Sequence, residues 1–253
     1  MAFRGVLREL LPPGLRHSLA RLLGHDGFYG DFQSFEHALR RCSGYNTPEI
    51  AQAFLRRTEM AGPEVDALLL QALAAFAPIA ASQRHLNVLD VGGANGAYYY
   101  KLKSHLPIHL TWVVLETEEM ARAHRGTSPI RFESDPAAIE DKFDVVFLSG
   151  VLQCLPDPYK ALFEFGRRGN FVIVNRLPLG TRDRIVIQQM RSSYRAAYPS
   201  WILERERFIA AVSSLGKLRM YWGSHEAAVI DGRPLPYCGM LIDRTIPAVH
   251  YSE

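Results

Sequence analysis

Apolar residues follow two different periods along this chain, and the change falls near residue 84. Before it, apolar positions recur at helical spacing in Ser34 to Leu39, Ile50 to Phe54 and Pro63 to Phe76. The tetrapeptide Asn46-Thr47-Pro48-Glu49 has the composition of a helix start, with Pro in the first turn. We therefore predict an N-terminal helical cap or lid region over residues 1–83, with loops at Phe28-Tyr29-Gly30-Asp31 and Ser43-Gly44-Tyr45-Asn46.

Beyond residue 84 the pattern changes to short β-rich runs separated by helical segments, which is typical of βαβ units and a parallel sheet. An amphipathic helix is predicted from Ile202 to Leu215, with Trp201 at its beginning. The β-rich runs predict strands at Asn87–Val91, Leu110–Glu116, Ile130–Glu133, Phe143–Ser149, Phe171–Asn175, Lys217–Trp222 and Tyr237–Ile242.

The last two predicted strands are connected differently from the first five. The chain between Trp222 and Tyr237 is short and rich in Gly and Pro, whereas a parallel connection needs a dozen or more residues, usually helical. We therefore predict that these two strands form an antiparallel closing pair. The fold class is α/β, with five parallel strands and a C-terminal hairpin in a domain over residues 84–253.

Composition and charge narrow the function classes. Hydrophobic residues make up 48% and charged residues 22% of the 253 residues, which are ordinary values for a globular protein. The net charge of +3 is spread along the chain and does not favour a nucleic-acid partner. Three widely spaced cysteines favour neither a disulfide framework nor a metal site, so we expect a reducing cytoplasm.

The N-terminal stretch from Met1 to Gly24 is rich in Arg and Leu and contains Glu9 as its acid. This pattern suits a surface helix packed on the domain, which we favour. It also suits a transit peptide or a helix lying at a membrane surface, which we do not favour. No apolar run reaches the roughly 20 residues of a membrane-spanning helix.

The strongest chemical signal is the stretch from Asn87 to Gly96, a buried strand that ends in a glycine-rich turn. Glycines let backbone N–H groups come close to a ligand. Glu116 ends the next predicted strand, where a carboxylate can accept hydrogen bonds from ribose hydroxyls. A strand, a glycine turn and an acid at this spacing can bind a nicotinamide nucleotide or a sulfonium nucleotide, so the pattern does not distinguish between them.

These residues and the predicted topology resemble the class I S-adenosylmethionine-dependent methyltransferases, whose Rossmann-like sheet has seven strands. The first motif of that superfamily corresponds to Asp90 and the glycine turn, with Ala94 in the place of the middle glycine. More narrowly, the chain resembles a bacterial family of methyltransferases with the signature Asp-x-Gly-Gly-Ala-x-Gly. The resemblance implies S-adenosyl-L-methionine as cofactor, bound by Asp90, Gly92, Gly93, Ala94, Gly96, Glu116, Ser134, Asp135, Ser149 and Gly150.

The resemblance also implies an acceptor side at the same edge of the sheet. Catalytic candidates are Gln153, which stands where many relatives have His, Arg176 as an anion-binding group, and His225 as a general base. Candidates for acceptor binding are Tyr29, Tyr45, Tyr98, Asn175, Gln188 and Trp201. No metal site is predicted.

Together these features predict methyl transfer to an O or N atom of a small-molecule or sugar-containing metabolite. Two alternatives remain at this point. A nicotinamide-linked oxidoreductase would need a crossover helix between the last two strands. A non-catalytic cofactor-binding protein would retain the site without turnover.

Overall fold

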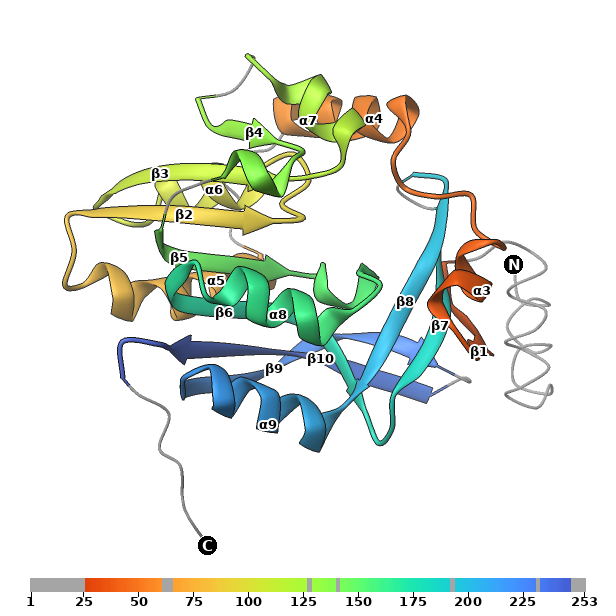
Figure 1. Ribbon diagram of the computed structural model, residues 1–253. Helices are drawn as coiled ribbons and strands as arrows, with labels where there is room; N and C mark the ends of the chain where they lie inside the picture. The colour runs from red at the N-terminus through yellow and green to blue at the C-terminus, as the bar shows by residue number, and fades with distance from the viewer. Residues whose placement is uncertain are drawn as a thin grey trace, which may run out of the picture.

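A mixed sheet forms the centre of the computed structural model, which describes residues 26–60, 66–126, 129–139, 142–191, 194–230 and 233–246. Five parallel strands run in the order β4-β3-β2-β5-β6 (Figure 1). Their bounds are β2 (His85–Val91), β3 (His109–Leu115), β4 (Arg131–Glu133), β5 (Phe143–Ser149) and β6 (Gly169–Gly180). The five predicted parallel strands are confirmed, although β6 extends five residues beyond its predicted end at Asn175.

The C-terminal hairpin is also confirmed. Strand β9 (Lys217–Ile230) pairs antiparallel with β10 (Arg233–Asp243), and β10 pairs antiparallel with β6. Strand β10 therefore lies between β6 and β9, and most of the Gly- and Pro-containing segment between Trp222 and Tyr237 belongs to these two long strands. This closing pair completes the seven-stranded sheet of a Rossmann-like methyltransferase fold.

Helices cover both faces of this sheet and form two apolar cores. One core lies under α5 (Ala67–Ala80) and α6 (Ala97–Lys103), with Phe76 and Trp112 fully buried. The other lies under α8 (Pro158–Gly166) and α9 (Arg205–Leu215), where Phe208 is fully buried. Figure 1 shows α8 and α9 on the near face, with α5 and α6 behind the strands. The apolar runs of β2, β3 and β5 are explained by burial on both faces.

A further antiparallel unit, absent from the sequence prediction, extends the sheet beyond β6. It consists of β1 (Gly27–Phe32), β7 (Arg184–Met190) and β8 (Ala196–Glu204), in the order β1-β7-β8. The C-terminal end of β6 joins this unit through a parallel pairing of Leu179 with Leu203. In Figure 1 the unit stands beside the carboxyl ends of the central strands.

Two local predictions are therefore wrong. Residues 27–32 form a strand instead of the predicted loop, because β7 supplies a pairing partner 153–162 positions later in the chain. Trp201 lies inside β8, and α9 begins at Arg205 instead of Ile202. In the first place a long-range strand pairing orders a segment predicted as a loop, and in the second the pairing of β8 with β7 prevails over local helical periodicity, which is only a weak prior.

The remaining N-terminal elements are helical, as predicted. They are α3 (Phe35–Leu39), capped by Ser34, and α4 (Pro48–Met60), which begins at Pro48. The predicted helix over Pro63 to Phe76 begins later, at Ala67, where the Asp66 side chain accepts from the Leu69 N–H. Helix α4 lies beside α7 (Glu118–His124), so the N-terminal segment contacts the central domain. The division of the chain at residue 84 stays a prediction.

Two further sequence predictions concern the termini and the membrane. The stretch from Met1 to Gly24 lies outside the described residues, so the surface helix stays a prediction. In the part of the chain that the structure describes, none of the helices has the length and apolarity needed to span a membrane.

Candidate functional site

The glycine turn between β2 and α6 is shaped by steric requirements. Gly92 has φ +69°, and a Cβ there would lie 2.5 Å from Cγ2 of Val151. A Cβ on Gly93 would lie 2.4 Å from Oδ2 of Asp90. Because real Cβ atoms do not approach other atoms this closely, glycine is required at both positions. The turn can therefore fold tightly over the Asp90 carboxyl.

Ala94 occupies the place of a glycine and takes the conformation that a glycine would take. Its φ is +49°, a left-handed value that costs a side-chain-bearing residue about 1–2 kcal/mol. The Ala94 N–H donates to Oε1 of Glu116 at 3.1 Å, and the Thr117 N–H donates to Oε2 at 2.6 Å. Two backbone donors thus fix the Glu116 carboxylate, and one of them, the Ala94 N–H, joins it to the glycine turn. Burial raises the pKa of Glu116.

Asp90 lies beneath this turn and is 1% exposed. Its Oδ2 accepts a hydrogen bond from Nε1 of Trp112 at 3.1 Å, and its Oδ1 has no partner among the described residues. Burial raises the pKa of Asp90 to about 7, against the lowering effect of the Trp112 hydrogen bond, and the nearby Glu116 raises it further. The buried, unpartnered oxygen is available to a hydrogen-bond donor that enters the site.

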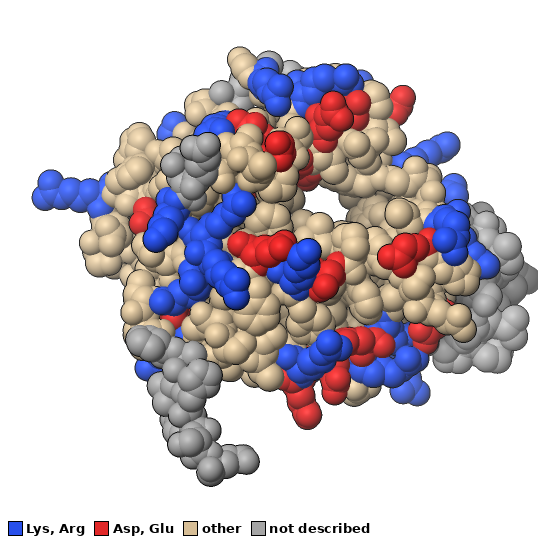
Figure 2. All heavy atoms as spheres, in the orientation of Figure 1, with Lys and Arg blue, Asp and Glu red and all other residues tan. Residues whose placement is uncertain are grey.

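A pocket of about 510 Å³ opens at the carboxyl ends of the central strands. Figure 2 shows an opening that passes through the molecule at this place, bordered by the strand ends on one side and β8 on the other. The pocket wall includes these predicted site residues: Tyr45, Asp90, Gly92, Gly93, Ala94, Tyr98, Glu116, Ser149, Gly150, Gln153, Arg176 and Gln188. The structure therefore brings together most of the candidates from both the cofactor and the acceptor sets.

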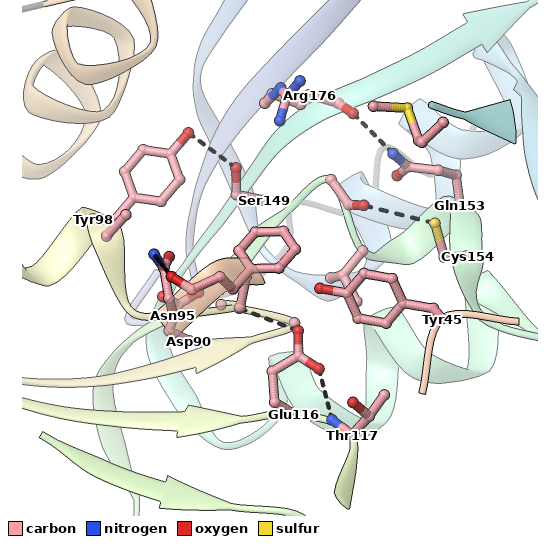
Figure 3. Close-up of a pocket in the computed structure, with 18 of the residues that line it drawn as sticks. Tyr45, Asp90, Asn95, Tyr98, Glu116, Thr117, Ser149, Gln153, Cys154 and Arg176 are labelled. Atoms are coloured by element: carbon pink, nitrogen blue, oxygen red, sulfur yellow. Dashed lines mark hydrogen bonds between the residues drawn. The ribbon is translucent and has the colours of Figure 1, made fainter. Parts of the chain in front are cut away.

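A chain of hydrogen bonds leads from the closing hairpin to the pocket. Nε1 of Trp222 donates to Oδ1 of Asn175 at 3.3 Å, and Nδ2 of Asn175 donates to Oγ of Ser149 at 3.4 Å. Ser149 Oγ donates to the Tyr98 hydroxyl at 3.3 Å (Figure 3). Because an indole N–H can only donate, it fixes the orientation of the Asn175 amide and hence of the whole chain. The Tyr98 hydroxyl accepts within the chain and has its proton left to donate.

Arg176 follows the parallel part of β6 and also has a left-handed backbone, with φ +55°. Its guanidinium lies 3.2 Å from the Glu226 carboxylate, and Cζ lies 5.8 Å from the centre of the Tyr237 ring. Its carbonyl accepts a hydrogen bond from Nε2 of Gln153 at 3.2 Å. Gln153 belongs to η2 (Leu152–Cys154), the short helix directly after β5.

Aromatic side chains form another part of the pocket wall. The Tyr45 ring makes edge contacts with Phe54, Tyr194 and Tyr198, at centroid distances of 6.3, 5.9 and 5.9 Å. Burial raises the pKa of the Tyr45, Tyr194 and Tyr198 hydroxyls, so these phenols stay protonated at neutral pH. This aromatic wall offers ring surface and O–H donors to a bound molecule.

Several wall residues were missed by the sequence reasoning. They are Phe54 on α4, Met190 at the end of β7, Tyr194 and Tyr198 around the start of β8, and Tyr237 on β10. A signal available for Tyr198 was its place three positions before Trp201, which the sequence indicates as a candidate. Its contact with the pocket depends on the β7-β8 pairing, which local pattern does not reveal.

Six predicted site residues lie outside the pocket wall. Asp135 accepts from the Ala137 N–H and caps η1 (Pro136–Ala138), and Ser134 precedes it. Asn175 lies behind Ser149, and Gly96 precedes α6. Tyr29 on β1 is buried, and Trp201 packs between the second core and α3. None of these six residues lines the pocket, so their roles in binding stay predictions. His225 lies in β9, and its side chain is outside the described part of the structure.

Two solved structures of known proteins resemble this chain at the level of fold. An S-adenosylmethionine-dependent methyltransferase from Methanosarcina mazei is 11% identical, covering 65% of this chain and 94% of that chain with a TM-score of 0.50. Human N-acetylserotonin methyltransferase, solved in complex with S-adenosylmethionine, is 15% identical, covering 79% of this chain and 57% of that chain with a TM-score of 0.50. These likenesses show the Rossmann-like methyltransferase fold. No family model and no curated protein matches the chain.

Proposed function

We propose that this protein is an S-adenosylmethionine-dependent methyltransferase that methylates an O or N atom of a small-molecule or sugar-containing metabolite. One observation carries the proposal. The glycine turn after β2 and Glu116 after β3 meet through the 3.1 Å contact of the Ala94 N–H, in the wall of one pocket. Ligands bind at this edge in open α/β sheets, and an acid in this place accepts hydrogen bonds from ribose hydroxyls.

The residues around the turn fit this cofactor. The turn packs so tightly on Asp90 that a Cβ at Gly93 would clash with the carboxyl, and Oδ1 of Asp90 is a buried acceptor without a partner among the described residues. When bound, S-adenosyl-L-methionine supplies a methyl group on a positively charged sulfur. Cofactor binding is assigned to these wall residues: Asp90, Gly92, Gly93, Ala94, Glu116, Ser149 and Gly150.

The acceptor is assigned to the part of the pocket that faces β7 and β8. Gln188, Met190 and Tyr198 line it from these strands, and Arg176 lines it from β6. A volume of about 510 Å³ lies within the range of small-molecule sites. Methyl transfer is an in-line displacement, so these side chains serve to align the nucleophile and to exclude water.

Calorimetry with S-adenosylhomocysteine tests the cofactor assignment. The wild-type protein is expected to bind it, and Glu116→Ala is expected to weaken binding by tenfold or more, about 1.4 kcal/mol, because ribose hydrogen bonds are lost. Binding of nicotinamide dinucleotide in its place would overturn the proposal in favour of an oxidoreductase. The antiparallel β9-β10 connection already speaks against that alternative, since it contains no crossover helix.

Turnover separates an enzyme from a cofactor-binding protein without activity. Transfer of a radiolabelled methyl group to a panel of amines, hydroxyl compounds and sugars is expected to give a labelled product. Binding without transfer to any member would favour the non-catalytic alternative. We place the protein in the cytoplasm, and the free thiols of Cys42, Cys154 and Cys238 support a reducing compartment.

A further inference from the structure

The side-chain amide of Gln153 lies in the pocket wall and is 5% exposed. Its Nε2 donates to the carbonyl of Arg176 at 3.2 Å. A carbonyl can only accept, so this contact fixes which end of the amide is nitrogen and which is oxygen. Oε1 has no hydrogen-bond partner among the described residues. Figure 3 shows the amide reaching toward the other labelled residues of the pocket.

The direction of the Arg176 carbonyl depends on an unusual backbone conformation. Arg176 has φ +55°, which few residues other than glycine adopt and which β-branched residues adopt very rarely. Strained backbone of this kind persists where the surrounding structure determines it, and it gathers at functional sites. Here the strained residue supplies the carbonyl that orients Gln153.

A buried acceptor oxygen without a partner is costly, so a site that keeps one invites a donor. Gln153 lies on the short helix that follows β5, close in sequence to Ser149 and Gly150. Its Oε1 is therefore an acceptor placed beside the residues assigned to the cofactor. The complementary ligand group is one that carries a hydrogen, namely an amine N–H or a hydroxyl O–H.

We propose, building on the function proposed above, that Oε1 of Gln153 accepts the N–H or O–H hydrogen of the acceptor atom to be methylated, and that Arg176 is a positioning residue acting through its carbonyl. The acceptor class is then an amine or alcohol that enters with its proton. The nucleophile's lone pair forms the bond to the methyl carbon, the electrons of the broken carbon–sulfur bond stay on sulfur, and the proton passes to solvent. A nucleophile without such a hydrogen would place a lone pair against Oε1 and be disfavoured.

Sinefungin is a probe that needs no knowledge of the acceptor. In this cofactor analogue an amine-bearing carbon replaces the methylated sulfur, so N–H donors stand at the transfer position. Calorimetry is expected to show that the wild-type protein binds sinefungin more tightly than S-adenosylhomocysteine. In Gln153→Leu this preference is expected to fall about tenfold, while affinity for S-adenosylhomocysteine stays within about twofold. Gln83→Leu makes the same change at an exposed site outside the pocket and is expected to keep the wild-type preference.

Two substitutions at Arg176 separate the carbonyl from the guanidinium. Arg176→Gly and Arg176→Val both remove the charged group, but glycine accepts φ +55° and valine does not. The glycine variant is expected to keep the preference for sinefungin, and the valine variant is expected to lose it. Thermal unfolding of each variant reports whether it is folded.

Each outcome decides between the two proposals. Failure of both ligands to bind the wild-type protein would overturn the proposed function itself. Binding of S-adenosylhomocysteine together with an unchanged preference in Gln153→Leu would overturn the role of Gln153 and leave the cofactor site standing. A loss of preference in Arg176→Gly would show that the guanidinium, and not the carbonyl, is what matters.

Discussion

At the scale of single residues, strain and burial gather around the pocket. Among the residues that the structure describes, the two with a positive φ that are not glycine are Ala94 and Arg176, and both line the pocket. Each has a backbone group engaged by a pocket side chain, Ala94 through its N–H and Arg176 through its carbonyl. The left-handed backbone turns the Ala94 N–H and the Arg176 carbonyl toward these side chains. The hydrogen bonds that result explain why the energetic cost of the left-handed conformation is tolerated.

Gly93→Ala is expected to weaken S-adenosylhomocysteine binding by at least tenfold. Its Cβ would lie 2.4 Å from Oδ2 of Asp90, so the turn must move away from the carboxyl. Calorimetry measures the affinity. Gly223→Ala is the matched control, because a Cβ there meets nothing within 4 Å. Equal affinity in the two variants would show that the turn is not the cofactor site.

Asp90→Asn is expected to stabilise the protein in a manner that depends on pH. The Asp90 carboxyl ionises near 3.8 when exposed, whereas burial raises its pKa to about 7 in the folded protein. Its contribution to stability is therefore full below about pH 4 and is lost as pH rises toward 7. Asn does not titrate, so the free energy of unfolding of the variant should rise relative to wild type across this window, by at most roughly 4 kcal/mol.

Urea unfolding at several pH values between about 4 and 7 measures this difference. A constant offset between wild type and Asp90→Asn would mean that the carboxyl does not titrate in this window. Asp135→Asn serves as a control, because Asp135 is exposed and caps a short helix outside the pocket.

At the scale of elements, the β1-β7-β8 unit decides the shape of the acceptor side. It carries Gln188, Met190 and Tyr198 to the pocket, and β1 holds β7 from the other side. The apolar residues of β1 and β7 lie in small clusters around Val186 and Ile187, whereas Leu203 of β8 belongs to the second large core. The β1-β7 edge shares little of the two large cores, so it can open without global unfolding.

Hydrogen exchange is expected to separate this unit from the central sheet. Amides of β7 should exchange faster than those of β2 and β5, whose residues are buried in the two main cores. Mass spectrometry of peptides from residues 184–190 and 85–91 makes the comparison. Equal protection of the two regions would mean that the added strands and the central sheet unfold together.

At the scale of the whole molecule, the pocket lies between the central sheet and the β1-β7-β8 unit. The glycine turn and Glu116 belong to the central sheet, whereas Tyr194 and Tyr198 belong to the added unit, and all four line one space. A ligand that fills the space contacts both parts. A ligand stabilises the folded state to which it binds. Because this ligand contacts both parts, we expect it to stabilise the central sheet and the β1-β7-β8 unit together.

S-adenosylhomocysteine is therefore expected to raise the melting temperature and to slow exchange in β7 and β8 as well as in the turn. At a ligand concentration of 100 times Kd the stabilisation is about 2.7 kcal/mol. Scanning calorimetry and hydrogen exchange on the same samples measure both effects. Protection limited to the glycine turn would show that the ligand does not bridge the two parts.

The sequence by itself determined the central sheet and the part of the pocket that contains the glycine turn and Glu116. The strand runs at Asn87–Val91 and Phe143–Ser149 are apolar enough to specify buried parallel strands, and the glycines of the turn are set by local sterics. Glu116 could be predicted because a side chain at the end of a parallel strand lies at the edge of the sheet where ligands bind. These features depend on residues near one another in the chain, which pattern and spacing report directly.

The tertiary structure alone decided the part of the pocket that faces β7 and β8. Strand β1 pairs with β7 across 153–162 positions, and Trp201 joins a strand although the following residues have helical spacing. The orientation of Gln153 depends on a carbonyl 23 positions away, turned by a left-handed backbone. Pairing between distant segments supplies no local periodicity, so these arrangements became visible only once the chain was folded.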